Sequence, residues 1–214
     1  MSASTARNHA TLKVAILVFD QVEVLDFAGP YEVFTTASRV HGRLQQDPAA
    51  PNRDLFDVVT VARTRHAVRA RAGLQVLPDA DFNTCEQADV LIVPGGVVDA
   101  AMQSTETLAW IARLSANAQM TASVCTGSFL LAASGVLTTE RVTTHWEDMN
   151  DLRQRFPLLE VCEQVRWVDH GRLLTSAGIS AGMDMSLHLV ARLGGEDLAV
   201  RTARQMDYAW NRQA

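Results

Sequence analysis

The stretch Thr121–Gly135, "TASVCTGSFLLAASG", predicts a buried strand, a sharp turn at Cys125 and then a helix. Small and β-branched residues precede the cysteine, and an apolar run of helical character follows it, with Gly135 as a C-terminal cap. Thr126 and Gly127 are small enough for a tight turn, and Gly127 can adopt a positive φ. Together these features indicate a nucleophile elbow with cysteine as the nucleophile.

Two interpretations of Cys125 follow from this local pattern. At the N-terminus of a helix, the N–H groups of the first turn and the helix dipole favour a reactive thiolate. A buried cysteine that only packs is also common. The stretch alone leaves both open, whereas Cys85 and Cys162 lack such a context and are interpreted as unreactive.

Strands and helices alternate along the rest of the chain. Helix periodicity predicts a helix over "YEVFTTASRV" with Pro30 near its first turn, and a polar loop follows from His41 to Asp54. A hairpin is expected around Asp169–Gly171. The other expected strands lie at residues 12–20, 55–63, 74–82, 88–96 and 141–146, and the other helices at 105–118, 180–195 and 196–210. The order predicts an α/β fold with a mostly parallel sheet sandwiched between helices.

The composition sets limits on the class of protein. With 214 residues and 48% hydrophobic content, we expect one domain over residues 12–214 and a flexible tail over residues 1–11. A net charge of -5 argues against a nucleic-acid partner. The sequence has no apolar run near the ~20 residues of a membrane span and no secretory signal, and its three cysteines are widely spaced, so we expect a cytoplasmic protein.

Three predicted strands end in unusual residues. Asp26 stands in "VLDFAG", Gly95 and Gly96 in "VPGG", and Cys125 in "SVCTG". In a parallel sheet these three points share one edge, where active sites form. Asp26 is either a helix N-cap or a site carboxyl with a raised pKa, while the glycine N–H groups are candidate donors to an anion formed at Cys125. Glu23 and Glu32 are interpreted as solvated or structural.

His145, in "TTHW", is expected at a strand end. A Cys–His pair is an ordinary way to activate a thiol, and a histidine bonded within the fold or at a subunit contact is the alternative. The pattern does not choose between them, and no role is assigned to His66, His170 or His188. Metal-ligand spacings are absent from the sequence, so no metal is expected.

Five ordered segments resemble the ThiJ/PfpI superfamily: "LDFAGPYEVF", "ADVLIVPGG", "SVCTGSFLLAASGVL", "TTHW" and "LLTSAGISAGMDMSLHLV". The resemblance covers residues 12–208 and implies a flavodoxin-like, class I glutamine amidotransferase-like fold. Two branches share the Ser-Val-Cys-Thr-Gly form: isocyanide hydratases and the amidase-like domains of AraC-type regulators. Ser123 differs from the glycine of many PfpI-type peptidases. Because the sequence is acidic, stops at Ala214 and closes with "RQMDYAW", the hydratase branch is favoured.

The resemblance also implies roles for individual residues. They are Cys125 as nucleophile, Asp26 as its acidic partner, Thr126 beside the nucleophile, Gly96 after Gly95 in the backbone-donor turn, and His145 as a shared histidine. The implied enzyme is a hydro-lyase that converts a small-molecule isocyanide into an N-substituted formamide through a Cys125 thioimidate, without a cofactor and as a homodimer. The residues 41–54 exceed the typical hydratase loop, which bears on substrate access and the dimer contact.

Which of Asp26 and His145 handles the proton stays open at this point. Three other functions do too. A different cysteine enzyme would act on glyoxals or amide bonds. A redox-responsive protein would oxidise Cys125 reversibly. A regulatory domain would bind a small molecule without chemistry.

Overall fold

The computed structural model describes residues 11–45 and 54–214. Apart from Thr11, the predicted tail lies outside these residues, as do residues 46–53 of the predicted loop. Seven strands form one sheet in the order β10-β11-β7-β6-β1-β2-β5. Neighbouring strands are parallel except β10, which is antiparallel to β11. Their bounds are β1 Leu12–Leu17, β2 Phe56–Ala62, β5 Ala80–Asp81, β6 Val90–Val93, β7 Met120–Val124, β10 Trp167–His170 and β11 Leu173–Ser176.

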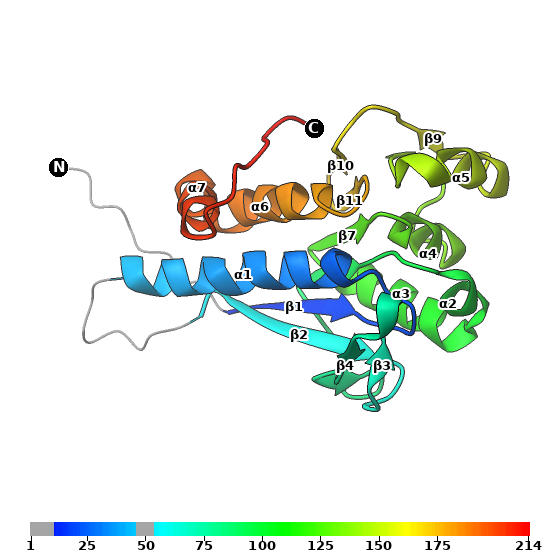
Figure 1. Ribbon diagram of the computed structural model, residues 1–214, viewed down its shortest axis with the longest axis horizontal. Coiled ribbons are helices and arrows are strands. Elements are labelled where there is room, and N and C mark those ends of the chain that lie inside the picture. Colours follow the sequence, from blue (N-terminus) through cyan, green and yellow to red (C-terminus); the bar gives the residue numbers. More distant parts are fainter. Residues whose placement is uncertain (1–10, 46–53) are drawn as a thin grey trace.

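Helices cover both faces of this sheet (Figure 1). One face packs against α1 (Val24–Leu44), α6 (Ala181–Gly194) and α7 (Glu196–Gln205), and the other against α2 (Asp99–Gln103), α3 (Thr105–Asn117) and α4 (Gly127–Ala133). Two small two-stranded sheets stand apart, made by β3 (Val68–Arg69) with β4 (Gln75–Val76) and by β8 (Arg141–Val142) with β9 (Glu160–Val161). The remaining helical segments are η1 (Arg71–Gly73), η2 (Trp146–Asp148) and α5 (Met149–Arg155).

The central strands are apolar on both faces because both faces are covered. In β1, Val14 and Ile16 join the core under α1, α6 and α7, while Ala15 and Leu17 join the core under α3 and α4. All four are fully buried. Continuous apolar runs of this kind are typical of parallel strands between helix layers. The predicted α/β fold with a mostly parallel sheet is therefore confirmed.

The helix α1 differs from its sequence prediction. It begins at Val24, so Pro30 is its seventh residue and lies inside it, not near its start. Proline has no N–H to donate to the carbonyl four residues earlier, but burial of the helix against the sheet outweighs that loss. The helix also continues to Leu44, so residues 41–44 of the predicted loop are helical. Glu23 is the N-cap residue, and the N-cap interpretation of Asp26 is wrong.

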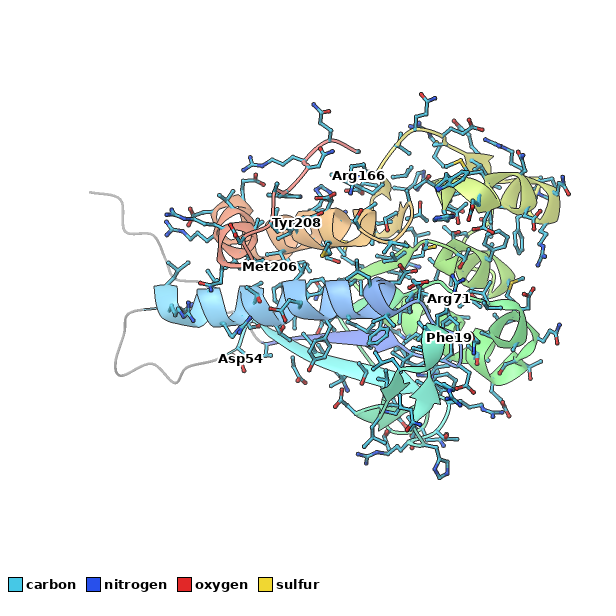
Figure 2. The ribbon with its side chains drawn as sticks, viewed as in Figure 1. Phe19, Asp54, Arg71, Arg166, Met206 and Tyr208 are labelled. Carbon is cyan, nitrogen blue, oxygen red and sulfur yellow. The ribbon has the colours of Figure 1, made fainter. Side chains whose placement is uncertain are left out.

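Three other segments depart from prediction. The expected strand at residues 74–82 consists of two short strands, β4 and β5, which belong to different sheets. Only Arg141 and Val142 of the predicted strand 141–146 are extended, and they pair with β9 outside the main sheet. The last helix stops at Gln205, and the segment after it returns to α6 (Figure 2). There Tyr208 Oη donates to the carbonyl of Ser180 and Trp210 Nε1 to that of Asp184. Within the described part of the chain, no helix is long and apolar enough to cross a membrane.

Candidate active site

Cys125 stands on a sharp turn between β7 and α4. Its φ of 56° lies in the left-handed region, which a non-glycine residue adopts at a cost of order 1–3 kcal/mol. Its carbonyl accepts hydrogen bonds from the hydroxyls of Thr144 (3.0 Å) and Ser128 (3.3 Å), and its N–H donates to the carbonyl of Ser176 at 3.1 Å. These bonds hold the strained backbone that presents the thiol, as the elbow prediction requires.

Gly127 can adopt a positive φ, but the residue of the turn that does so is Cys125. Gly127 is needed for a different reason, because a Cβ there would lie 2.0 Å from the carbonyl oxygen of Val93. The start of α4 therefore crosses the end of β6 with no room for a side chain. This close crossing brings the β6 turn and the cysteine turn together.

Asp26 reaches the same point from the first turn of α1. Its side chain is fully buried, and its Oδ2 accepts the Gly95 N–H at 3.1 Å. Oδ1 has no hydrogen-bond partner among the described residues. Burial, reinforced by the charge of Glu23, raises the pKa of Asp26 to about 7, although the bonds from Gly95 and Cys125 oppose the shift. The raised pKa predicted for a site carboxyl is what this environment produces.

The Gly95–Gly96 turn organises its neighbours. Gly95 N–H donates to Asp26, and Gly96 N–H donates to the hydroxyl of Thr126 at 2.9 Å. That hydroxyl in turn faces the Gly96 carbonyl oxygen at 2.9 Å. A Cβ on Gly95 would lie 2.5 Å from the Thr126 N and Oγ1 atoms. Since both glycine N–H groups already have acceptors, their predicted role as donors to an anion stays a prediction.

Burial sets the acidity of the Cys125 thiol. Burial, with 7% of the residue exposed, raises its pKa to about 12, and the nearby Asp26 carboxylate adds to the shift. Interactions with Thr126 at the helix start lower the pKa only in part. The helix start thus acts in the direction predicted for it, but α4 has only seven residues, and the effect of burial is larger.

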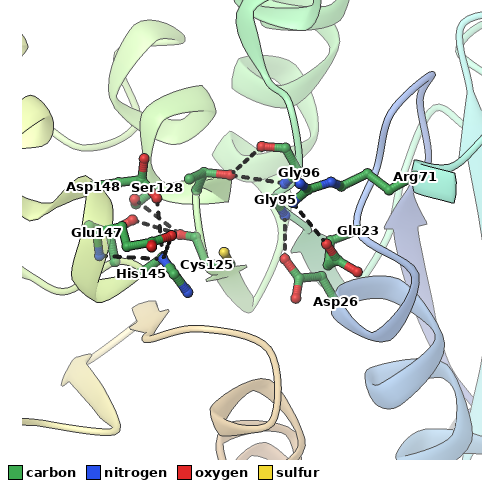
Figure 3. A network of polar contacts seen from close by, with 12 residues as sticks. Glu23, Asp26, Arg71, Gly95, Gly96, Cys125, Ser128, His145, Glu147 and Asp148 are labelled. Carbon is green, nitrogen blue, oxygen red and sulfur yellow. Dashed lines mark hydrogen bonds and ion pairs between the residues drawn. The ribbon is translucent and has the colours of Figure 1, made fainter.

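His145 lies on the opposite side of the thiol from Asp26 (Figure 3). It caps η2, three residues beyond β8, so the prediction of a strand end is wrong. Its Nδ1 atom faces acidic side chains: it lies 3.4 Å from Asp148 Oδ2 and 3.7 Å from Glu147 Oε2, and it accepts the Glu147 N–H at 3.4 Å. No hydrogen bond joins His145 to Cys125 among the residues that the structure describes.

A cavity of about 190 Å³ opens beside the thiol. Besides residues named above, it is lined by Arg71 and Ile179, which the sequence analysis did not single out. Glu23, interpreted as solvated or structural, forms an ion pair with Arg71 (3.1 Å) at this cavity. These residues come from short segments with no periodic pattern, so only the packed structure brings them to the site. In the described ranges 11–45 and 54–214, no three metal-ligating side chains gather at one point.

Comparison with known proteins gives a consistent match. The model of the DJ-1/PfpI family matches residues 12–192. An isonitrile hydratase of Pseudomonas putida is 36% identical over 92% of this chain and 79% of its own length. A crystal structure of a ThiJ/PfpI family protein from Pseudomonas syringae superposes with a TM-score of 0.80 and 30% identity, covering 94% of this chain and 77% of that one.

Transcriptional regulators also match. The HTH-type transcriptional regulator GbdR of Pseudomonas aeruginosa is 27% identical over 94% of this chain, which spans 52% of the regulator's length. A hydratase and a transcriptional regulator thus both match this chain. The arrangement of the site has to show which of the two functions this protein has.

Proposed function

Because the chain belongs to the DJ-1/PfpI family, we propose that it is an isonitrile hydratase, a hydro-lyase that adds water to an isocyanide. One observation carries the proposal. The fully buried carboxyl of Asp26 interacts with the thiol of Cys125 on the nucleophile elbow, and one of its oxygens lacks a partner among the described residues. The 36% identity to the hydratase supports the choice of substrate.

In the first step Asp26 acts as the base. At neutral pH the thiol of Cys125 is protonated and the Asp26 carboxyl is close to half ionised. As the sulfur attacks the isocyanide carbon, the S–H proton moves to Asp26, and Asp26 passes it to the same carbon. The C–S and C–H bonds form together with an N=C double bond, giving a thioimidate and a free carboxylate.

In the second step the carboxylate activates water. Asp26 takes a proton from the water while the water oxygen bonds to the thioimidate carbon. Asp26 then passes this proton to the thioimidate nitrogen. The tetrahedral carbon then forms the C=O bond as the C–S bond breaks, and the hydroxyl proton returns to the leaving sulfur. The balance is one isocyanide plus one water to one N-substituted formamide, so the residues need no redox partner.

This assignment gives Asp26 the proton transfers and leaves His145 outside them. What supports it is the direction of the His145 ring, whose Nδ1 atom faces Asp148 and Glu147. Thr126 and the two glycines hold the carboxyl and the elbow in place.

The proposal predicts an acid limb in the pH profile of kcat/KM. Asp26 has to be ionised to take the thiol proton, so kcat/KM should rise with pH through a midpoint of about 7. Each pH unit below the limb should lower kcat/KM about tenfold. A profile that is flat between pH 5 and 8 would show that Asp26 is not the base.

Turnover of p-nitrophenyl isocyanide by matched variants tests the function. We expect N-(4-nitrophenyl)formamide from the wild type, a loss of at least about a thousandfold in Cys125→Ala, and a loss of about a hundredfold or more in Asp26→Asn. His145→Ala should keep most of the activity. Wild-type protein without turnover contradicts the proposal, and loss in His145→Ala alone indicates a Cys–His hydrolase instead.

A ligand-binding domain without chemistry is the second candidate, favoured by the match to GbdR over 94% of this chain. It predicts that the wild type binds small molecules in the Cys125 cavity and that no isocyanide is converted. Calorimetric binding without product formation would support this candidate over the hydratase.

A further inference from the structure

Arg71 reaches the catalytic cavity from a hairpin that stands apart from the main sheet. The hairpin consists of β3 and β4, joined through η1, in which Ala72 (φ 58°) and Gly73 (φ 95°) form the turn. Figure 2 shows Arg71 near the N-terminal end of α1. Two successive residues with positive φ turn the chain tightly here, so the short hairpin can end against the site.

The backbone of this hairpin is bonded to the loop before α1. Arg71 N–H donates to the carbonyl of Val22 at 3.0 Å, and Gln21 N–H donates to the carbonyl of Arg69 at 2.7 Å. Glu23, which follows Val22 in this loop, donates its N–H to the carbonyl of Gly95 at 2.9 Å. The hairpin, the loop and the glycine turn thus form one network of backbone hydrogen bonds around the cavity. This network fixes the position of the Arg71 backbone.

The side chain of Arg71 completes the network. Its Nη1 atom lies 3.1 Å from Glu23 Oε2, and both residues line the cavity with Cys125. Figure 3 shows the guanidinium extending toward Glu23 at the glycine turn. Glu23 is also tied to Asp26, whose N–H donates to the Glu23 carbonyl at 3.2 Å. A charge pair therefore lies next to the buried carboxyl, on the wall of the reaction cavity.

We propose that Arg71, through its ion pair with Glu23, is a positioning residue that keeps Asp26 ready to exchange protons with Cys125. The inference rests on the proposed function for its meaning in turnover, but the ion pair and its neighbours are features of the structure alone. Among the described residues, no hydrogen bond or ion pair joins Arg71 to Asp26 or Cys125. It acts through Glu23 and through its own charge.

The charges that act on Asp26 come from several elements. Glu23, the N-cap residue of α1, raises the pKa of Asp26. The hydrogen bonds from Gly95 and Cys125 lower it, and so does Arg71 on the hairpin. Across the cavity, the charge of Asp148 raises the pKa of the Cys125 thiol, and His145 in turn opposes the burial that raises the pKa of Asp148. Removing Arg71 leaves Glu23 unpaired beside a buried carboxyl, so the proton on Asp26 should be held more tightly. Removing Glu23 should have the opposite effect.

The pH dependence of kcat/KM in paired variants tests the inference. Arg71→Met should move the acid limb up by about half a pH unit, which is about threefold lower kcat/KM below the limb. Glu23→Gln should move it down by a similar amount. Arg71→Lys restores the charge and should restore the limb, which a loss of packing alone would not explain.

Arg63→Met is the matched control. Arg63 forms a more exposed ion pair with Glu106 (3.4 Å), and neither residue is among the causes that shift the pKa of Asp26. The acid limb of the kcat/KM profile of Arg63→Met should coincide with that of the wild type. An unmoved limb in both Arg71→Met and Glu23→Gln, with or without a uniform loss of rate, overturns the inference, and so does an equal shift in Arg63→Met.

Titration of the Asp26 carboxyl by ¹³C NMR, assigned with Asp26→Asn, separates this inference from the proposed function. The titration midpoint should move in the same directions as the limb, whether or not an isocyanide is converted. Shifted midpoints in a protein without turnover support the ion-pair role and reject the hydratase. Identical midpoints in all variants of an active enzyme reject the ion-pair role and leave the hydratase standing.

Discussion

Burial acts in the same direction on Asp26 and Cys125, two neighbouring acids. It raises the pKa of Asp26 to about 7 and that of Cys125 to about 12. With rising pH the carboxyl therefore ionises before the thiol, and in the proposed mechanism the thiol loses its proton as it attacks the isocyanide. The shared sheet edge singled out both residues in the sequence, but the depth of their burial could not be predicted, because it is a property of the packed fold.

The stability of the protein should report the same buried carboxyl. The ordinary pKa of Asp26 is 3.8, and in the folded state it is about 7, so the folded protein holds this proton more tightly. The resulting stability is fully present below pH 3.8 and is lost as pH rises through 7. Asp26→Asn should therefore be more stable than the wild type at pH 8, by on the order of 2–4 kcal/mol, and should lose this advantage near pH 4.

Urea unfolding at pH 4 and pH 8 measures this difference. Asp81→Asn is a control of opposite sign, because hydrogen bonds from the backbone and side chain of Thr84 lower the pKa of Asp81. That variant should be less stable than the wild type at pH 8. An equal effect of Asp26→Asn at both pH values contradicts the assignment of the raised pKa.

Thr126 tests the turn that holds the site. Its hydroxyl accepts the Gly96 N–H and faces the Gly96 carbonyl, both at 2.9 Å. Thr126→Val keeps the shape but leaves both backbone groups unpaired, so it should lower the free energy of unfolding by about 1–3 kcal/mol and lower kcat. Thr126→Ser keeps the hydroxyl and should therefore retain most of the free energy of unfolding and most of kcat. Urea unfolding and the isocyanide assay measure the two quantities.

At the scale of elements, α1 connects the site to the sheet. Its first turn carries Asp26, and further along Ser38 meets the outer edge of β2. The buried Ser38 hydroxyl donates to the carbonyl of Phe56 (2.9 Å) and accepts the Phe56 N–H (2.8 Å). An unpaired strand edge favours aggregation, and this side chain covers part of it.

Ser38→Ala should therefore leave two backbone groups of β2 without partners. We expect a loss of about 1–3 kcal/mol in the free energy of unfolding. Thr35→Ala is the matched control on the same helix, since within the described part of the chain its hydroxyl bonds only to the helix carbonyls of Tyr31 and Glu32. Its effect should stay within about 0.5 kcal/mol. Equal losses in the two variants would contradict a role for Ser38 in holding β2.

The elements divide into those that the sequence predicts and those that it does not. Continuous apolar runs predicted β1, β2 and β6, and helix periodicity predicted α3, since these patterns follow directly from burial between layers. The start of α1 and the extent of β8 were wrong, because Pro30 and the residues after Val142 are governed by tertiary contacts. Arg71 and Asp148 were missed because η1 and η2 are too short to show a period.

At the scale of the molecule, the family fold places three strand ends at one edge, and the site arises from their meeting. β1, β6 and β7 are neighbours in the sheet, so the loop before α1, the Gly95–Gly96 turn and Cys125 necessarily converge. This convergence was predictable from the sequence. The acidic surroundings of His145 were not, because they depend on how η2 folds back over the thiol.

The mass of the intact protein, taken after acid quench during turnover of p-nitrophenyl isocyanide, tests the central claim most directly. The account predicts an adduct on Cys125 equal to the whole mass of the isocyanide, since the thiol adds without a leaving group. The adduct should disappear as the formamide accumulates and be absent in Cys125→Ala. Formamide produced at the wild-type rate by Cys125→Ala, without any adduct, would contradict the account.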